Sequence, residues 1–435
     1  VVAGCDLARG GVGMPLWRVR AEDVTGTGGV VAPEERLGWP LTLGFGAQHV
    51  AAMFSATVLV PTITGFPVTT TLLFSGLGTL LFLVVTRNRV PGYLGASFAY
   101  VGPLLAASEA GAEPSAMLGG VLVAGVTLVM LGVAVKALGV GLVEVLLPPV
   151  VTGAVVVLVG LGMAPHATAS VSAQPVVAGV TLLTIVVAAV VGRGLWRRLA
   201  VVLGIAVGWT ASWLSGPLEN APELLDIPWT GLPELVTPVI TPSVSLLVLP
   251  VVITVLAENL GHLKAVAAVT GRDLDRHAGD VLIGNGLSTS LAGAGGGVGT
   301  TTYGENIGVM ALSRVHSTAA CATAAVLAVV LSFSPRVGAA VVLVPPGVIG
   351  GVALVLFGLI AMLGFRVWSD HQVDFRDPLN LVVAGAALVA GVGGLTFTVG
   401  GVEIGGMAWG ALVVVLLYPV LRGLRAVVPR RPPAG

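Results

Sequence analysis

Long apolar runs separated by short polar stretches fill most of the chain between residues 41 and 424. A transmembrane helix needs about 20 mostly apolar residues, and by that measure the pattern predicts fourteen spans, counted from the N-terminal side. Their expected ranges are 42–63, 67–86, 93–107, 115–135, 146–164, 175–192, 199–214, 244–262, 279–296, 300–313, 317–334, 338–362, 379–397 and 405–421. The third and tenth are short and interrupted by glycine. Their composition predicts a short extended strand within each.

A proline pair recurs seven spans apart. Pro148-Pro149 and Pro345-Pro346 are each followed by three variable residues and a glycine, and the pairs open spans five and twelve. An odd number of spans per repeat places the two copies in opposite orientations, and inverted repeats are typical of transporters. Chance similarity in an apolar chain is the alternative. The predicted fold is an all-α polytopic membrane protein of two inverted seven-span repeats.

Composition supports a membrane location. Of 435 residues, 55% are hydrophobic and only 10% are charged, whereas soluble proteins carry about a quarter charged residues. The formal net charge is zero, which argues against a nucleic-acid partner because such proteins carry a basic surface. Two isolated cysteines, Cys5 and Cys321, form neither a disulfide framework nor a metal-binding pattern.

The basic residues follow the predicted topology. With the N-terminus inside, all of the 21 Lys and Arg residues except Arg336 fall in the tails or in inside loops. Cytoplasmic loops carry such an excess of Lys and Arg. We therefore expect a multi-pass protein of the inner (cytoplasmic) cell membrane with both termini cytoplasmic. The polar segments 1–40 and 425–435 are expected to be disordered cytoplasmic tails.

Two carboxylates, Glu258 and Glu305, fall well inside apolar spans. A charge at the bilayer centre costs at least a few kcal/mol, so such residues are functional candidates. Glu305 follows a strand-like run of threonines and Gly304 and opens a helix-compatible stretch. An extended piece running into a half-helix leaves N–H groups that can point at a site. A glycine-containing kink with a structural carboxylate is the alternative.

A histidine lies near the first of these acids. His262 is four residues after Glu258, hence on the same helix face, where the pair can share a proton near neutral pH. A structural Glu–His hydrogen bond is the alternative. Gln48 holds in span one the place of Glu258 in span eight, so it is a candidate polar or supporting residue. Its neighbour His49 is expected to pack.

Several motifs now identify a family. The segments AENLGHL, NGLSTSLAG and TTYGENIGVMALSRVHS, with AQHVAAMFSATVLVP and PGYLGASFAYVGP, resemble the nucleobase/ascorbate transporter family in its uracil permease branch. The similarity runs from about Gly46 to Leu421. Purine and xanthine members typically have Gln-Asn where this chain has Glu305-Asn306, so the resemblance implies a pyrimidine carrier.

The resemblance also implies a division into domains. Residues 41–140 (spans 1–4) and 244–335 (spans 8–11) would form a core domain. Residues 141–243 (spans 5–7) and 336–424 (spans 12–14) would form a gate domain. The family further implies a homodimer through the gate domain.

The resemblance assigns residues to the substrate site. The implied set is Glu258, Glu305, Phe98, Gly304, Tyr303 and Ala56. Both glutamates would bind the polar edge of uracil, while backbone amides near Phe98 and at Tyr303 and Gly304 add hydrogen bonds. Ala56 would line the pocket, Asn306 and Gln48 would support it, and His262 would join the proton-coupling network. Phe357 stands where the uracil permease has a tyrosine, which removes a polar contact on the gate side.

The chemistry of the base fits this set. Uracil carries alternating N–H donors and C=O acceptors on a flat ring, so two carboxylates, backbone N–H groups and the Phe98 ring could complement it. The leading hypothesis is a proton-coupled uracil symporter with the proton as coupling ion and no other cofactor. A same-fold carrier of a purine, xanthine or other small polar or anionic substrate is the alternative. A channel would need a continuous polar stripe, and an enzyme would need a metal-ligand cluster or nucleophile–base set; no span shows either.

Overall fold

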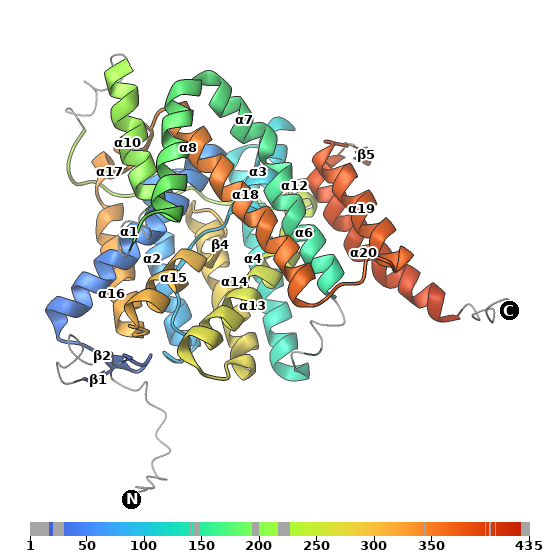
Figure 1. Ribbon diagram of the computed structural model, residues 1–435, viewed down its shortest axis with the longest axis horizontal. Coiled ribbons are helices and arrows are strands. Elements are labelled where there is room, and N and C mark those ends of the chain that lie inside the picture. Colours follow the sequence, from blue (N-terminus) through green and yellow to red (C-terminus); the bar gives the residue numbers. More distant parts are fainter. Residues whose placement is uncertain are drawn as a thin grey trace, which may run out of the picture.

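The molecule is built almost entirely of α-helices (Figure 1). This computed structural model describes residues 17–20, 30–139, 141, 148–193, 200–215, 227–342, 344–395, 397–399, 402–404 and 406–427. The helices before residue 240 are α1 (Trp39–Thr64), α2 (Val68–Val85), α3 (Val101–Glu109), α4 (Pro114–Leu138), α6 (Pro149–Gly162), α7 (Ala164–Ala173), α8 (Pro175–Val190) and α10 (Ala200–Ser215). Those after it are α12 (Pro242–Val248), α13 (Val251–Thr270), α14 (Ala278–Gly295), α15 (Gly304–Ser313), α16 (Thr318–Ser332), α17 (Pro335–Val342), α18 (Pro346–Asp370), α19 (Pro378–Val392) and α20 (Gly406–Val427).

Proline fixes where many of these helices begin. α4, α6, α8, α12, α18 and α19 each have a proline as their first residue. This position suits proline because its missing N–H has no helical partner there and its φ is already helical. The two proline pairs noted in the sequence behave alike: Pro148 caps α6 and Pro345 caps α18, both with extended backbone.

Six helices of the described chain are long and apolar enough to cross a membrane: α1, α2, α4, α18, the run of α6 with α7, and the run of α12 with α13. Four shorter apolar helices, α8, α10, α16 and α19, accompany them. The predicted twelfth span, 338–362, is wrong in its limits. Its helix begins only at Pro346, because the proline pair separates it from the short helix α17.

The helices pack mainly within two groups. One contains α1, α2, α4, α14 and α16, and the other contains α6, α7, α8, α10 and α18. α19 and α20 pair with each other and against α6, and in Figure 1 they lie at the edge beside the C-terminal end. Contacts between α13 and α6 and between α1 and α10 join the groups.

Glycines bring α4 and α14 into close contact. A Cβ added at Gly125 would lie 2.5 Å from the backbone nitrogen of Ser290, and one at Gly286 would lie 2.6 Å from that of Val129. Close backbone approach through small residues is a usual way to pack helices within membranes, where lipid offers no hydrophobic drive between helices. This pair supports the strands described next.

Two short strands lie inside the bundle. β3 (Leu94–Ala96) and β4 (Thr300–Thr302) are antiparallel, with Gly95 opposite Thr301. Both are buried, and β4 lies near the centre of Figure 1. Because each strand satisfies the backbone of the other, non-helical chain can persist at this depth. Two further strands, β5 (Phe397–Val399) and β6 (Val402–Ile404), form a hairpin before α20.

Part of the N-terminal segment predicted to be a disordered tail is ordered, which corrects that prediction for residues 17–20 and 30–40. β1 (Arg18–Val19) pairs with β2 (Glu35–Arg36), and Val31 forms a bridge with Val315. The Val31 N–H donates to the Arg314 carbonyl at 3.0 Å. Val31 and Leu37 are buried. Apolar side chains in an otherwise polar segment therefore anchor it to the turn after α15.

Candidate substrate site

Two segments in which a strand runs into a helix meet at the β3–β4 pair. The first arm consists of β3, the short 3₁₀ helix η1 (Phe98–Tyr100) and α3. The second arm consists of β4 and α15. Because the strands are antiparallel, the helical part of each arm leaves from the opposite end of the pair. The predicted site residues lie on these arms and on α1 and α13, which pack against α15.

The start of α15 presents the second acid. No side chain caps this helix, so N–H groups of its first turn lack helical partners. Gly304 and Glu305 are exposed, whereas the flanking residues Tyr303 and Asn306 are buried. Glu305 thus stands at an accessible helix N-terminus, where a negative charge is favourable.

Glu258 contacts the first arm. It is half-buried on α13, and its Oε2 accepts a hydrogen bond from the Ser97 hydroxyl at 3.3 Å. Its charge also interacts with that of Glu305. The two acids predicted from sequence therefore lie on two helices, α13 and α15, that pack against each other.

His262 contacts the second arm instead of Glu258. Its Nδ1 is 2.9 Å from the Thr302 hydroxyl, which donates to the Asn259 side-chain oxygen at 3.2 Å. The Thr302 hydroxyl has one proton, and it donates that proton to Asn259. His262 Nδ1 must therefore carry the hydrogen and donate to Thr302, which leaves Nε2 as an acceptor beside Gly304. The structural Glu258–His262 hydrogen bond, which was the alternative to a shared proton, is absent between these two described side chains. Glu258 bonds Ser97 of the first arm and His262 bonds Thr302 of the second, so a proton shared between the two residues stays a prediction.

Tyr303 is a framework residue. Its N–H donates to the Tyr93 carbonyl at 3.0 Å, so the predicted use of this amide for substrate is wrong for the conformation described. Its hydroxyl donates to the Ala96 carbonyl at 2.8 Å and is 3.0 Å from the Thr57 hydroxyl. The side chain therefore ties the second arm to β3 and α1.

Asn306 joins the second arm to α1. Its side-chain nitrogen donates to His49 Nδ1 at 3.0 Å and to the His49 carbonyl at 3.1 Å. Both residues are buried, so His49 does more than pack, contrary to expectation. Gln48 is half-buried on the same helix, and it stays a predicted support residue.

Aromatic rings face each other across the two helix groups. Phe98 on the first arm and Phe357 on α18 meet edge to face, with ring centroids 5.8 Å apart. Phe357 is buried and Phe98 is half-buried. Ala56 falls within α1, but its side chain lies outside the described part of the structure.

Sequence reasoning missed the hydroxyl and amide partners of the site: Ser97, Thr302, Asn259 and Thr57. Only Asn259 carried a signal, as the neighbour of an acid inside an apolar span. The others are short hydroxyl residues of a common kind. Among the described residues no group of three or more His, Cys, Asp or Glu could hold a metal ion. Chemically, the site offers carboxylate acceptors, uncapped N–H donors and an aromatic face.

Known proteins resemble this chain over most of its length. A profile of the permease family (Xan_ur_permease) matches residues 41–400. The Escherichia coli K12 protein named "Putative pyrimidine permease RutG" is 42% identical over 426 residues, which cover 94% of this chain and 95% of that protein. The "Uracil permease" of Bacillus caldolyticus is 39% identical over 394 residues, covering 86% and 91%. The "Uracil permease" of Escherichia coli K12 is 36% identical over 400 residues, covering 88% and 92%.

Solved structures share the fold. SLC26A9 superposes with a TM-score of 0.67 at 11% identity, covering 90% of this chain and 66% of that one. The transmembrane domain of a cyanobacterial bicarbonate transporter, BicA, gives a TM-score of 0.55 at 15% identity, covering 87% and 96%. At such low identity these likenesses describe the fold alone.

Proposed function

The chain belongs to the permease family, as the sequence motifs predicted, and from this premise we propose that it is a proton-coupled symporter that imports uracil across the cytoplasmic membrane. Its relatives are permeases and not enzymes. Relatives named for uracil or pyrimidine transport support the choice of base. The observation that carries the proposal is Glu305, exposed at the uncapped start of α15, with the helix that bears Glu258, α13, packed against α15.

Base recognition would use complementary hydrogen bonds. The Glu258 and Glu305 carboxylates accept from the two ring N–H groups, and the first-turn N–H groups of α15 at Gly304 serve a ring carbonyl. Phe98 stacks on the ring. A base with a different edge leaves buried partners unpaired, at a cost of about 1–3 kcal/mol each. This cost disfavours adenine, whose ring edge differs from that of uracil.

Transport would proceed by alternating access in a fourteen-span fold of two inverted seven-span repeats, with β3 in span three and β4 in span ten. The proposed core domain would comprise residues 41–140 with 244–335, and the proposed gate domain residues 141–243 with 336–424. The packing of most helices within two groups supports this division. The Phe98–Phe357 contact lies between them. Both termini would be cytoplasmic, and the gate domain would form a homodimer.

Proton coupling would involve Glu258 and His262. An empty carrier must return through a closed state, where uncompensated charge is costly. Each of these residues contacts a different arm, so a change of proton occupancy can alter both arms. Protonation then favours uracil binding, and the proton leaves inward with the base.

Uptake by purified protein in liposomes tests the function. Radiolabelled uracil should accumulate above its outside concentration when an inward proton gradient is imposed, and should only equilibrate without one. Protein-free liposomes are the control. Uptake equal to that control would refute transport of uracil, and uptake unaffected by the gradient would refute proton coupling.

The coupling residue has its own test. Exchange of uracil between loaded vesicles and medium needs no net proton movement, so His262→Ala should keep most of the exchange. Accumulation driven by the gradient should be lost. Full accumulation in His262→Ala would place the coupling elsewhere, on Glu258 or Glu305.

A carrier of another substrate on the same fold is the second candidate, since the fold neighbours include a bicarbonate transporter. Two carboxylates in one site argue against an anion, because like charges repel at this depth. Competition by xanthine or bicarbonate in the uptake assay separates the candidates, and only uracil should compete strongly.

A further inference from the structure

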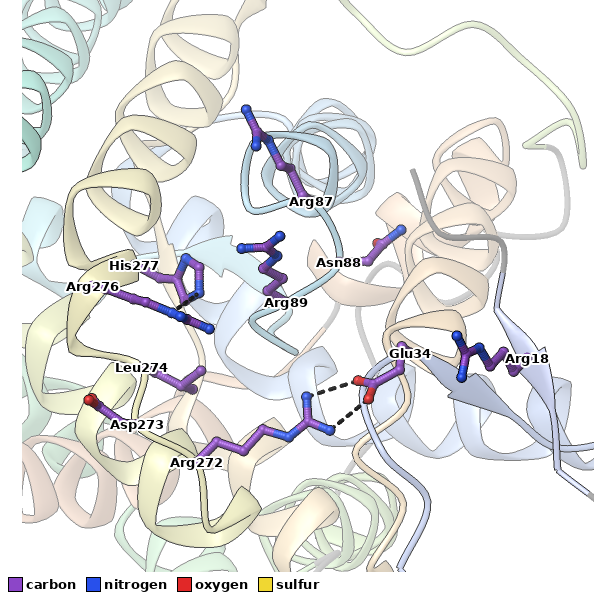
Figure 2. Close-up of a pocket in the computed structure, with 10 residues that line it drawn as sticks. All are labelled: Arg18, Glu34, Arg87, Asn88, Arg89, Arg272, Asp273, Leu274, Arg276 and His277. Carbon is purple, nitrogen blue, oxygen red and sulfur yellow. Dashed lines mark hydrogen bonds and ion pairs between the residues drawn. The ribbon is translucent and has the colours of Figure 1, made fainter. Parts of the chain in front are cut away.

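A pocket lies away from the candidate substrate site, beside the N-terminal strands (Figure 2). It is a cavity of about 670 Å³, within the size range of sites for small molecules. Its walls come from β1, the segment before β2, the turn after α2, and the turn and 3₁₀ helix η2 (Asp275–His277) after α13. The lining residues are Arg18, Glu34, Arg87, Asn88, Arg89, Arg272, Asp273, Leu274, Arg276 and His277.

Positive charge dominates this pocket, because five arginines face two carboxylates. Glu34 is already engaged: Arg272 donates to its two oxygens at 2.9 and 2.7 Å. Asp273 accepts from the N–H of Asp275 at 3.1 Å. The side chains of Arg18, Arg87 and Arg89 make no hydrogen bond or ion pair with another described residue, so their donors are unused.

Two guanidinium groups converge beside a buried histidine. In Figure 2, Arg89 from the turn after α2 and Arg276 from η2 extend toward the same open region near His277. Arg276 Nε donates to His277 Nε2 at 3.2 Å. Burial lowers the pKa of His277, and the Arg276 and Arg89 charges lower it further, against the opposing effect of Asp280. The neutral ring can thus accept from Arg276 while adding no charge.

We propose that this arginine pocket is a binding site for a phosphate-bearing anion, either a free phosphorylated small molecule or a phospholipid headgroup. Guanidinium groups bind phosphate oxygens through paired, charge-assisted hydrogen bonds. Arginines from separate segments surround a concave space large enough for more than inorganic phosphate. Basic residues that serve membrane topology alone need only lie on the correct side and need not converge on a cavity.

Binding to the purified full-length protein in detergent tests the site. The probes are uridine 5′-monophosphate and, as its uncharged counterpart, uridine, measured by calorimetry at low salt. Removing two guanidinium groups with Arg89→Gln/Arg276→Gln should weaken binding of the monophosphate at least about tenfold, because charge-assisted hydrogen bonds to the phosphate are lost. The matched control is Arg366→Gln, an exposed arginine of α18 paired with Asp370 outside the pocket, which should bind like the parent. Uridine should bind far more weakly, and saturating uracil should not compete.

A second experiment, with lipid, identifies the source of the phosphate. If the ligand is a phospholipid, native mass spectrometry should show phosphatidylglycerol retained by the parent protein and by Arg366→Gln but lost from the double variant. The monophosphate should in that case not bind. Either pattern supports the site. The proposal would be overturned if the parent and the double variant behaved equally in both experiments, or if uracil displaced the monophosphate. Single Arg89→Gln, with its melting temperature measured without ligand, replaces the double variant if the latter does not fold.

Discussion

The two arms that meet at the β3–β4 pair are alike in backbone and different in chemistry. Each arm has a glycine, within its strand or just before it, that is covered by a tyrosine of the other arm. A Cβ at Gly95 would lie 2.5 Å from the Tyr303 ring, and one at Gly299, just before β4, would lie 2.3 Å from the Tyr100 ring. Both contacts require glycine for close approach, and they lock the arms together in a reciprocal way.

The side chains break this symmetry. The second arm carries Glu305 and makes buried side-chain bonds to α1 through Tyr303 and Asn306. The first arm carries no charge before the end of α3, and it offers the Phe98 ring and the Ser97 hydroxyl. The same strand-then-helix backbone, used twice, therefore forms the place where the two arms meet. One arm is specialised for polar recognition and the other for an apolar face.

The largest effect should follow from the charge of the second arm. Glu305→Gln keeps the shape of the side chain but replaces an acceptor with a donor that faces a uracil N–H. We expect uracil binding, measured by calorimetry, to weaken at least about tenfold, on the order of 1.4 kcal/mol or more. Glu113→Gln, which changes an exposed acid before α4 that makes no capping bond, is the matched control. Unchanged binding in Glu305→Gln would make Glu305 a structural residue.

The framework bonds of the two tyrosines should differ. Tyr303→Phe leaves the Ala96 carbonyl without its tyrosine donor, and we expect a loss of unfolding free energy of about 1–2 kcal/mol. Tyr100→Phe should cost less, because the buried Tyr100 hydroxyl lies near Thr289 without forming a hydrogen bond among the described residues. Thermal unfolding in detergent compares the two variants. Equal losses would show that the arms are anchored alike.

The apolar face of the first arm should contribute less to binding than the carboxylate. Phe98→Leu keeps the site apolar but removes ring stacking and the edge-to-face contact with Phe357. Aromatic pairs add about 0.5–1.5 kcal/mol beyond area burial, so uracil affinity should fall only several-fold. Leu105→Ala, which trims a side chain of α3 packed against the core, controls for general loosening of the arm. A loss larger than that of Glu305→Gln would reverse the proposed division between the arms.

The smallest effect should come from the N-terminal segment that supports the second arm. Arg272 holds the pKa of Glu34 below its usual range, so the ion pair stabilises the fold above that range and is lost as pH falls through the lowered pKa. The pair is well exposed and is worth less than about 1 kcal/mol. Glu34→Gln should therefore lower the melting temperature slightly at pH 7, and the difference should vanish in acid. A difference that persists in acid would mean that the Glu34 charge is not its source.

Local sequence signals predicted those features of the fold that are determined by a few neighbouring residues. The proline pairs start α6 and α18, and the two acids in apolar runs, Glu258 and Glu305, lie on α13 and α15, which pack against each other. The family was evident from motifs such as that around Glu305, and the permease relatives confirm it. These features depend on a few neighbouring residues, which a sequence displays directly.

Contacts between distant segments could not be predicted in the same way. His262 turns to Thr302, 40 residues away, and Asn306 binds His49, 257 residues away. The Tyr303 amide is occupied because the residue just before β3, Tyr93, presents its carbonyl there. Val31 anchors a segment that is otherwise polar. Each depends on which side chain the folded bundle brings within reach, and many threonines and valines are equivalent candidates in the sequence.

The most direct test of the account is thermal stabilisation of the purified protein by free bases. A ligand that binds only the folded state raises the melting temperature, and the stabilisation grows with the logarithm of the ratio of ligand concentration to Kd. Uracil should raise the melting temperature of the parent protein, xanthine should raise it far less, and Glu305→Gln should lose most of the uracil response. Equal stabilisation by xanthine and uracil, or a full uracil response in Glu305→Gln, would contradict a uracil site built on the second arm.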